Sequence, residues 1–180
     1  VDQRQISKKA PAYFEKASFD CKRTYNIHGV PCTFLSPNQK FIQDLSTELP
    51  DQWLMADESS AIKVFWGSPS EIIGHDASTW GTMTDPDCHF INLYDRDWVG
   101  QRDFMSMQLG DNEIFVASLY DISDDGFHNF LRYFLPRYLL KQNKILFHSS
   151  VVVDPETKKA SVFFGHSGAG KTTISGLCSD

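Results

Sequence analysis

Residues 162–173 read Val162-Phe163-Phe164-Gly165-His166-Ser167-Gly168-Ala169-Gly170-Lys171-Thr172-Thr173. This stretch decides the fold class, because it matches the pattern Gly-x-x-x-x-Gly-Lys-Ser/Thr at every fixed position. The apolar residues before the loop predict a buried strand, and residues 172–177 predict the start of a helix after it. Strand, glycine-rich loop and helix form the arrangement that a phosphate-binding loop (P-loop) needs.

Each fixed position of this loop has a chemical reason. Glycines at 165, 168 and 170 let the backbone bend and approach phosphate closely, so that amide N–H groups converge on its oxygens. Lys171 is predicted to place its ammonium near the β- and γ-phosphates, and the Thr172 hydroxyl to complete a Mg²⁺ shell. The predicted cofactors are therefore ATP and Mg²⁺. The residues predicted to bind the triphosphate are Gly165, His166, Ser167, Gly168, Ala169, Gly170, Lys171, Thr172 and Thr173.

The residues just upstream predict a hairpin that leads into the loop. Residues 145–153 and 160–164 are rich in β-forming residues, and residues 154–158 form a turn between them. If the two strands pair, His148 lies near the end that leads into Gly165. There it could contact a transferring phosphoryl group or orient an acceptor. The alternative is a core or edge histidine that is satisfied by a hydrogen bond.

A helix is predicted before this hairpin, and it separates two predicted domains. Asp124 can cap the helix, and Pro136 removes one backbone donor inside it. Its apolar residues recur at three- and four-residue spacing: Phe127, Phe130, Leu131, Phe134, Leu135, Tyr138 and Leu139. We place the boundary near this helix, between a β-rich N-terminal module of unknown role (1–125) and the start of a P-loop domain (126–180).

The N-terminal module is predicted to consist mainly of short strands. These are Ser18–Ile27, Cys32–Leu35, Ala61–Trp66, Phe90–Leu93, Phe104–Leu109 and Ile114–Tyr120. The last two flank Gly110-Asp111-Asn112, which is typical of a hairpin turn. One helix is expected over Phe41–Leu49, ended by Pro50, and residues 66–70 are expected to form a loop. The predicted fold class is therefore α/β (α+β), a β-rich module followed by a P-loop core.

Two further sets of side chains bear on metals and on redox state. His75, Asp76, Asp85, Asp87 and His89 could hold a metal, but so few polar residues in a turn-rich segment are more often a solvated loop. The cysteines show no CxxC spacing, which favours reduced thiols of a cytoplasmic protein. They are Cys21, Cys32, Cys88 and Cys178.

Composition excludes several classes of protein. The chain has 180 residues, of which 41% are hydrophobic and 22% charged, as in globular proteins with one core and at most a small additional module. A net charge of -6 argues against nucleic-acid partners and against a polybasic membrane anchor. No apolar run reaches the roughly 20 residues that span a bilayer, and the first residues lack the apolar segment of a signal peptide.

Phe147-His148-Ser149-Ser150-Val151, followed by residues 162–173, resembles the C-terminal domain of HPr serine kinase and its relatives. That family has a histidine strand, a short turn, an apolar strand and then GxSGAGKST, and its fold is similar to phosphoenolpyruvate carboxykinase. The resemblance covers roughly residues 126–180. It implies that Gly165–Thr172 binds the triphosphate, that His148 and Lys171 are catalytic, and that Thr172 coordinates the metal. Homo-oligomers occur in this family.

The chain departs from the family at its end, which leaves three functions open. The family's acidic pair lies beyond the helix that follows the loop, whereas this chain stops at Asp180, so we expect it to be inactive alone. The first reading is an ATP-dependent kinase that transfers the γ-phosphate to a hydroxyl of a protein, a peptide or a small molecule. The second is a non-catalytic ATP-binding sensor. The third is a carboxykinase-like enzyme on a small acid, whose basic cluster the arginines do not obviously supply: Arg96, Arg102, Arg132 and Arg137.

Overall fold

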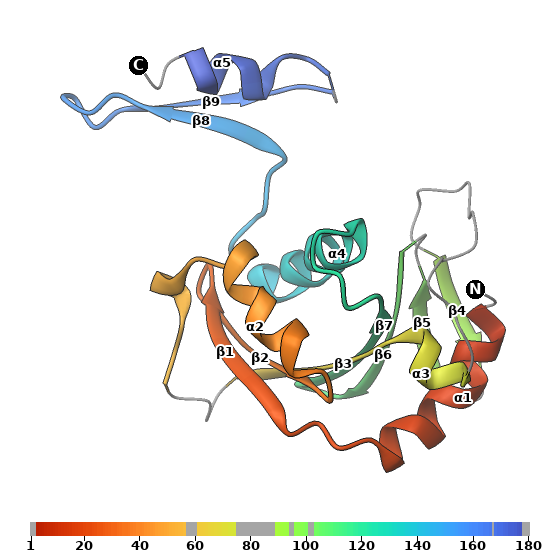
Figure 1. Ribbon diagram of the computed structural model, residues 1–180. Helices are drawn as coiled ribbons and strands as arrows, with labels where there is room; N and C mark the ends of the chain where they lie inside the picture. The colour runs from red at the N-terminus through yellow and green to blue at the C-terminus, as the bar shows by residue number, and fades with distance from the viewer. Residues whose placement is uncertain are drawn as a thin grey trace. The chain divides into compact units, whose positions relative to one another are not determined.

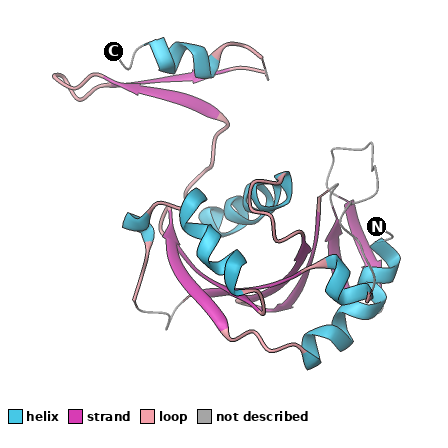
Figure 2. Ribbon diagram, viewed as in Figure 1, coloured by secondary structure: helices cyan, strands magenta, loops and turns pink. Residues whose placement is uncertain are grey.

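The computed structural model describes residues 3–56, 61–74, 89–93, 96–100, 103–166 and 168–177, with the backbone alone at 3, 4 and 89–100. The chain divides into two compact units, Val1–Gln142 and Asn143–Asp180 (Figure 1). Both units contain helices and strands, which confirms the mixed α/β class (Figure 2). Among the described residues, none of the helices has the length and apolar character of a membrane span.

The first unit is built on a seven-stranded sheet of order β1-β2-β3-β7-β6-β5-β4. Its strands are β1 (Cys21–Ile27), β2 (Val30–Ser36), β3 (Ile62–Gly67), β4 (His89–Leu93), β5 (Arg96–Gly100), β6 (Phe104–Gly110) and β7 (Glu113–Ser118). β3 lies parallel to both of its neighbours, β2 and β7, and the remaining pairs are antiparallel. β3 and β7 lie side by side in the interior of the sheet, which agrees with their strongly apolar sequences.

Both faces of this sheet are covered by helices. Val64 and Trp66 of β3 pack in one cluster with α2 (Gln39–Glu48) and α4 (Asp125–Lys141). Phe65, between them, packs in a second cluster with α1 (Gln3–Lys16) and α3 (Pro69–Ile73). Successive side chains of a strand point to opposite faces, so a strand that is apolar throughout can serve both clusters. A short 3₁₀ helix, Asp51–Trp53, follows α2.

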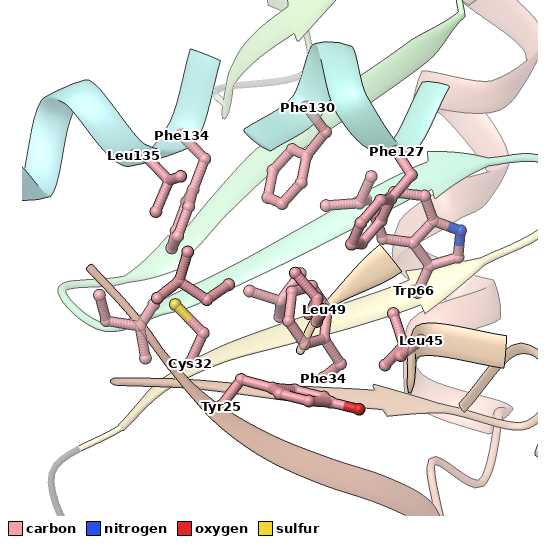
Figure 3. Close-up of a cluster of buried hydrophobic side chains, with 14 of the residues drawn as sticks. Tyr25, Cys32, Phe34, Leu45, Leu49, Trp66, Phe127, Phe130, Phe134 and Leu135 are labelled. Carbon is pink, nitrogen blue, oxygen red and sulfur yellow. The ribbon is translucent and has the colours of Figure 1, made fainter. Parts of the chain in front are cut away.

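The cluster beneath α2 and α4 is rich in aromatic rings (Figure 3). Trp66 stacks on Phe41 at 5.0 Å between ring centroids and meets Phe130 edge-on at 5.6 Å. Phe130 also stacks on Phe134 at 5.2 Å. All four side chains are essentially inaccessible to solvent. Burial of such large apolar surfaces is the main source of stability in a domain of this size.

Several predicted elements are confirmed. The helix expected from residue 41 is α2, and the Asn38 side chain accepts a hydrogen bond from Phe41 N at 3.0 Å. The helix expected after Asp124 is α4, whose N-cap Asp124 accepts from Asp125 N at 2.8 Å. Strands β6 and β7 pair around Gly110-Asp111-Asn112, as the turn residues predicted.

Three expectations differ from the structure. Residues 66–70 are not simply a loop, because Pro69 begins the short helix α3 between an N-cap Ser68 and the left-handed Gly74. Helix α1 and strand β5 were not predicted; α1 contains Pro11, and only a few of its residues are apolar. The strand expected from Ile145 begins at Ser149, and residues 145–148 are not in a regular element.

The division of the structure also differs from the predicted boundary between residues 125 and 126. It falls between Gln142 and Asn143, at the end of α4. The reason is the apolar face of α4, where Phe127 and Phe130 are buried in the core of the first unit. By packing, α4 belongs with the strands that precede it.

The second unit consists of a hairpin and one helix. β8 (Ser149–Val153) pairs antiparallel with β9 (Ala160–Phe164), and α5 (Lys171–Leu177) follows the loop. The strands predicted at 145–153 and 160–164 thus pair around the predicted turn. None of the described residues from 143 to 177 is buried.

Candidate functional site

The predicted P-loop connects the end of β9 to the start of α5. Phe164 is the last residue of the strand, and Lys171 is the first residue of the helix. Inside the connection, Ala169 N donates to His166 O at 3.1 Å, and Ile174 N donates to Gly170 O at 2.9 Å. The first bond closes a turn within the loop, and the second starts the helical pattern. Strand, loop and helix therefore follow one another as the sequence predicted.

Glycine is needed in the loop for two different reasons. Gly168 and Gly170 have φ angles of 80° and 81°, in the left-handed region that residues with a Cβ adopt only with strain. At Gly165 the reason is space, since a Cβ would lie 2.9 Å from the Cβ of Ala169. The loop thus turns tightly and keeps its main chain uncovered, which a backbone cradle for phosphate requires.

The side chain of Lys171 lies across the loop. Its Nζ donates to the carbonyl oxygens of Gly165 at 2.8 Å and His166 at 2.9 Å. The ammonium is therefore held at the loop by neutral acceptors, with no carboxylate among these partners. A phosphate oxygen is a stronger, charged acceptor for the same donor.

His148 stands immediately before β8, and the pairing of Ser149 with Phe164 brings it to the end of the hairpin that leads into the loop. Its side chain is exposed. A pocket of about 380 Å³ is lined by His148, Gly168, Gly170, Lys171, Thr172 and Thr173. Its volume falls in the range of small-molecule sites.

Six of the predicted site residues are therefore brought together around one pocket. Gly165, His166 and Ala169 belong to the loop without lining the pocket, and Ser167 lies outside the described residues. Thr172, which is predicted to bind the metal, lines the pocket. The P-loop and His148 thus form one candidate site within the second unit.

Ser150 was not predicted, and it connects the hairpin to the helix. Its hydroxyl donates to the main-chain oxygen of Lys171 at 2.8 Å, which ties β8 to the first residue of α5. No pattern of neighbouring residues indicates this role, because it depends on a residue 21 positions away.

The described part of the chain has no group of three or more His, Cys, Asp or Glu side chains that could hold a metal. His75, Asp76, Asp85 and Asp87 lie outside the described residues, as does the side chain of His89. In the described part of the second unit the carboxylates are Asp154 and Glu156, at the far turn of the hairpin. Hydrogen bonds from Thr157 lower the pKa of Asp154, which is committed to that turn.

The chain matches a protein-family model. Neither curated proteins nor solved structures match it. The family model of phosphoenolpyruvate carboxykinase matches residues 97–179, slightly less than half of the chain. The match includes His148 and the loop and begins upstream of the expected limit at 126, in strand β5. It supports the carboxykinase-like part of the resemblance and gives no support to a relationship with HPr kinase. Residues 97–179 therefore form a region similar to phosphoenolpyruvate carboxykinase.

Proposed function

We propose that the chain binds a nucleoside triphosphate, with ATP as the expected nucleotide, at Gly165–Thr172. The observation that carries this proposal is the pocket that joins the loop glycines, Lys171 and His148. Left-handed Gly168 and Gly170 keep the main chain accessible to phosphate oxygens. The family match also supports this proposal, because it includes the whole loop.

In this proposal each side chain has one role. Lys171 leaves the carbonyl oxygens of Gly165 and His166 and binds the β- and γ-phosphates. Thr172 supplies a hydroxyl oxygen to Mg²⁺, a hard cation that keeps most of its remaining ligands as phosphate and water oxygens. His148 faces the bound phosphates from the hairpin and acts in transfer of the phosphoryl group.

The reaction we propose is phosphoryl transfer from ATP, and two acceptor classes follow from two observations. The family match favours a small acid of the carboxykinase type. The segment from Phe147 to Val151 together with the loop favours a hydroxyl acceptor, as in an HPr kinase-like enzyme. Transfer also requires a base and further metal ligands. The described carboxylates of the second unit lie away from the loop, so binding is the activity that this unit supports by itself.

The cellular location that we propose is the cytoplasm. Cys21 is partly exposed and Cys32 is buried, and both are free thiols. Free thiols are usual in a reducing compartment.

Calorimetric titration with ATP, with and without Mg²⁺, tests the proposal. The expected result is saturable binding that Mg²⁺ strengthens. Lys171→Ala should weaken it roughly tenfold or more, because the loop loses its charged donor. The matched control is Lys159→Ala, which removes an exposed lysine from the turn of the same hairpin. His148→Ala should leave ATP affinity nearly unchanged.

Two other results would argue against parts of this proposal, and a third measurement distinguishes the two acceptor classes. Equal affinity in the wild type and Lys171→Ala would exclude the loop as the triphosphate site. Binding of ATP without turnover by any longer form of the protein would favour the non-catalytic sensor. Saturable binding of phosphoenolpyruvate in the presence of MgADP would favour the small-acid acceptor, and its absence would favour the hydroxyl acceptor.

A further inference from the structure

A second pocket lies entirely within the first unit, between the end of α4 and the β6–β7 hairpin. Its volume is about 430 Å³. It is lined by Gln108, Leu109, Gly110, Asp111, Arg137, Tyr138 and Lys141. No residue of the P-loop lines it, so it is separate from the site described above.

Two cations stand on its helical wall. Arg137 and Lys141 are four residues apart and therefore neighbours on one face of α4. Like charges at this spacing destabilise an isolated helix. The helix dipole favours a cation in the last turn, which explains the position of Lys141. It does not explain why Lys141 and Arg137 line the same pocket.

Aromatic rings fix the direction of both cations. The guanidinium carbon of Arg137 lies 5.4 Å from the ring centroid of Tyr133, and the group also donates a hydrogen bond to the Tyr133 hydroxyl. The ammonium of Lys141 lies 4.9 Å from the ring centroid of Tyr138. Such contacts restrict long side chains that would otherwise move freely, which lowers the entropic cost of binding.

Neither cation is neutralised by a carboxylate of the described chain. The ion pairs within the described ranges are Lys40–Asp44, Lys63–Glu113 and His128–Glu48. Asp111 lines the same pocket without forming an ion pair with Arg137 or Lys141. The pocket thus carries two cations and one anion, in a protein whose net charge is -6.

We propose that this pocket binds a small doubly charged oxyanion, a phosphate or a dicarboxylate, between Arg137 and Lys141. The guanidinium offers a planar pair of donors that matches two oxygens of one acid group, and the ammonium offers a compact charge for the second. Gln108 and Gly110 also line the pocket, and the side-chain amide of Gln108 donates a hydrogen bond to the Gly110 carbonyl oxygen. This site does not depend on nucleotide binding at the P-loop.

The experiment is a ¹H–¹⁵N NMR titration of the whole chain with succinate and, separately, with inorganic phosphate, at constant ionic strength. Acetate serves as the singly charged control. We expect saturable shifts of the amides at 108–111 and 137–141, with affinity on the order of 1 mM. Saturation with phosphate alone would assign a phosphate ligand, and saturation with succinate alone a dicarboxylate.

Variants sharpen the assignment. Arg137→Gln and Lys141→Gln should each weaken binding roughly tenfold, and both residues are exposed, so the fold should survive. Arg132→Gln, on the same helix but outside the pocket, should change nothing. Asp111→Asn should strengthen binding several-fold, because it removes the opposing charge. Lys171→Ala should leave these shifts intact even where ATP binding is lost.

The proposal is overturned if neither dianion gives saturable shifts at these amides by about 10 mM. It is equally overturned if Arg132→Gln weakens binding as much as Arg137→Gln, or if the shifts map to the P-loop instead. A failure of ATP binding at the P-loop would leave this result unaffected, so the two proposals can fail separately.

Discussion

The two units of the chain are stabilised in different ways. In the first unit Trp66, Phe130 and Phe134 have no accessible surface. In the second, Phe164 is 62% exposed and Leu177 is 75% exposed, and no described residue is buried. Burial of apolar surface contributes about 25 cal/mol per Å² to stability. This contribution stabilises the first unit through its core, and the second unit lacks it.

Local hydrogen bonds take the place of a core in the second unit. β8 and β9 share a ladder, Ser150 ties that ladder to Lys171, and the loop closes on itself through His166 and Ala169. A two-stranded hairpin is marginally stable in water by itself. The candidate site therefore rests on local geometry, whereas the fold of the first unit rests on packing. Regions that bind ligands are commonly drawn from the less stable parts of a protein.

The largest effect is expected from removing a core ring. Phe130→Ala should lower the free energy of unfolding by about 3–5 kcal/mol, because it leaves a cavity between Trp66 and Phe104. Phe164→Ala, in the second unit, should change it by well under 1 kcal/mol, since that side chain is mostly exposed. Urea unfolding followed by tryptophan fluorescence measures the first effect, because all four tryptophans lie in the first unit, and hydrogen exchange of the β8 and β9 amides measures the second. Equal losses in the two variants would mean that the two units do not differ in this way.

Substitution of two helical glycines by alanine should give smaller effects on stability, of opposite sign. A Cβ at Gly126 in α4 would lie 2.2 Å from Ser118 Oγ and 2.8 Å from the main-chain oxygen of Asp103, so Gly126→Ala should cost about 1–3 kcal/mol. A Cβ at Gly176 in α5 meets nothing within 4 Å. Gly176→Ala should therefore stabilise α5 by up to about 1 kcal/mol through helix propensity.

Thermal unfolding measures the loss at Gly126, and hydrogen exchange of the α5 amides measures the gain at Gly176. Protection in α5 that stays the same or falls in Gly176→Ala would show that this helix is restrained by more than local propensity.

Alkaline pH should lower the stability of the first unit through two of its tyrosines. Tyr13 and Tyr120 both donate to Glu71 Oε2, at 2.6 and 2.5 Å, and burial followed by this hydrogen bond raises the pKa of each phenol. The folded state thus favours the neutral phenols. Their contribution is fully present below the unfolded pKa of about 10 and is lost as pH rises above it. The second unit contains no tyrosine.

Urea midpoints between neutral pH and about pH 11 measure this fall. The double variant Tyr13→Phe, Tyr120→Phe should show a shallower decline than the wild type. A decline of the same slope in both proteins would assign the alkaline sensitivity to other groups.

The parts of the molecule that sequence could predict are those set by neighbours along the chain. The loop pattern, the Asp124 cap and the apolar period of α4 are local signals, and each element was found where it was expected. The glycine turn between β6 and β7 is of the same kind. Each signal depends on a few adjacent residues and on backbone geometry.

The parts that could not be predicted depend on distant residues. Helix α1 is largely polar and contains Pro11, and Ile6 and Ala10 become core residues only against the second face of the sheet. Ser150 acquires a role only when its hydroxyl meets Lys171, 21 positions away. The pocket of Arg137 and Lys141 likewise needs the β6–β7 hairpin beside α4. Tertiary contacts decided all three, and no local pattern reports them.

The smallest expected effect lies inside the packed core. The ring of Tyr25 is fully buried and contacts Phe34 at 6.5 Å between centroids, yet within the described chain its hydroxyl has no hydrogen-bond partner. A buried hydroxyl without a partner loses its hydrogen bonds to water on folding and forms none in the protein, which destabilises the folded state. Tyr25→Phe should therefore raise the free energy of unfolding by about 1 kcal/mol, measured by urea unfolding. A loss of stability would show that the hydroxyl is bonded in solution, for instance to a buried water. The first unit would then depend on a polar contact within its core, as the second depends on Ser150.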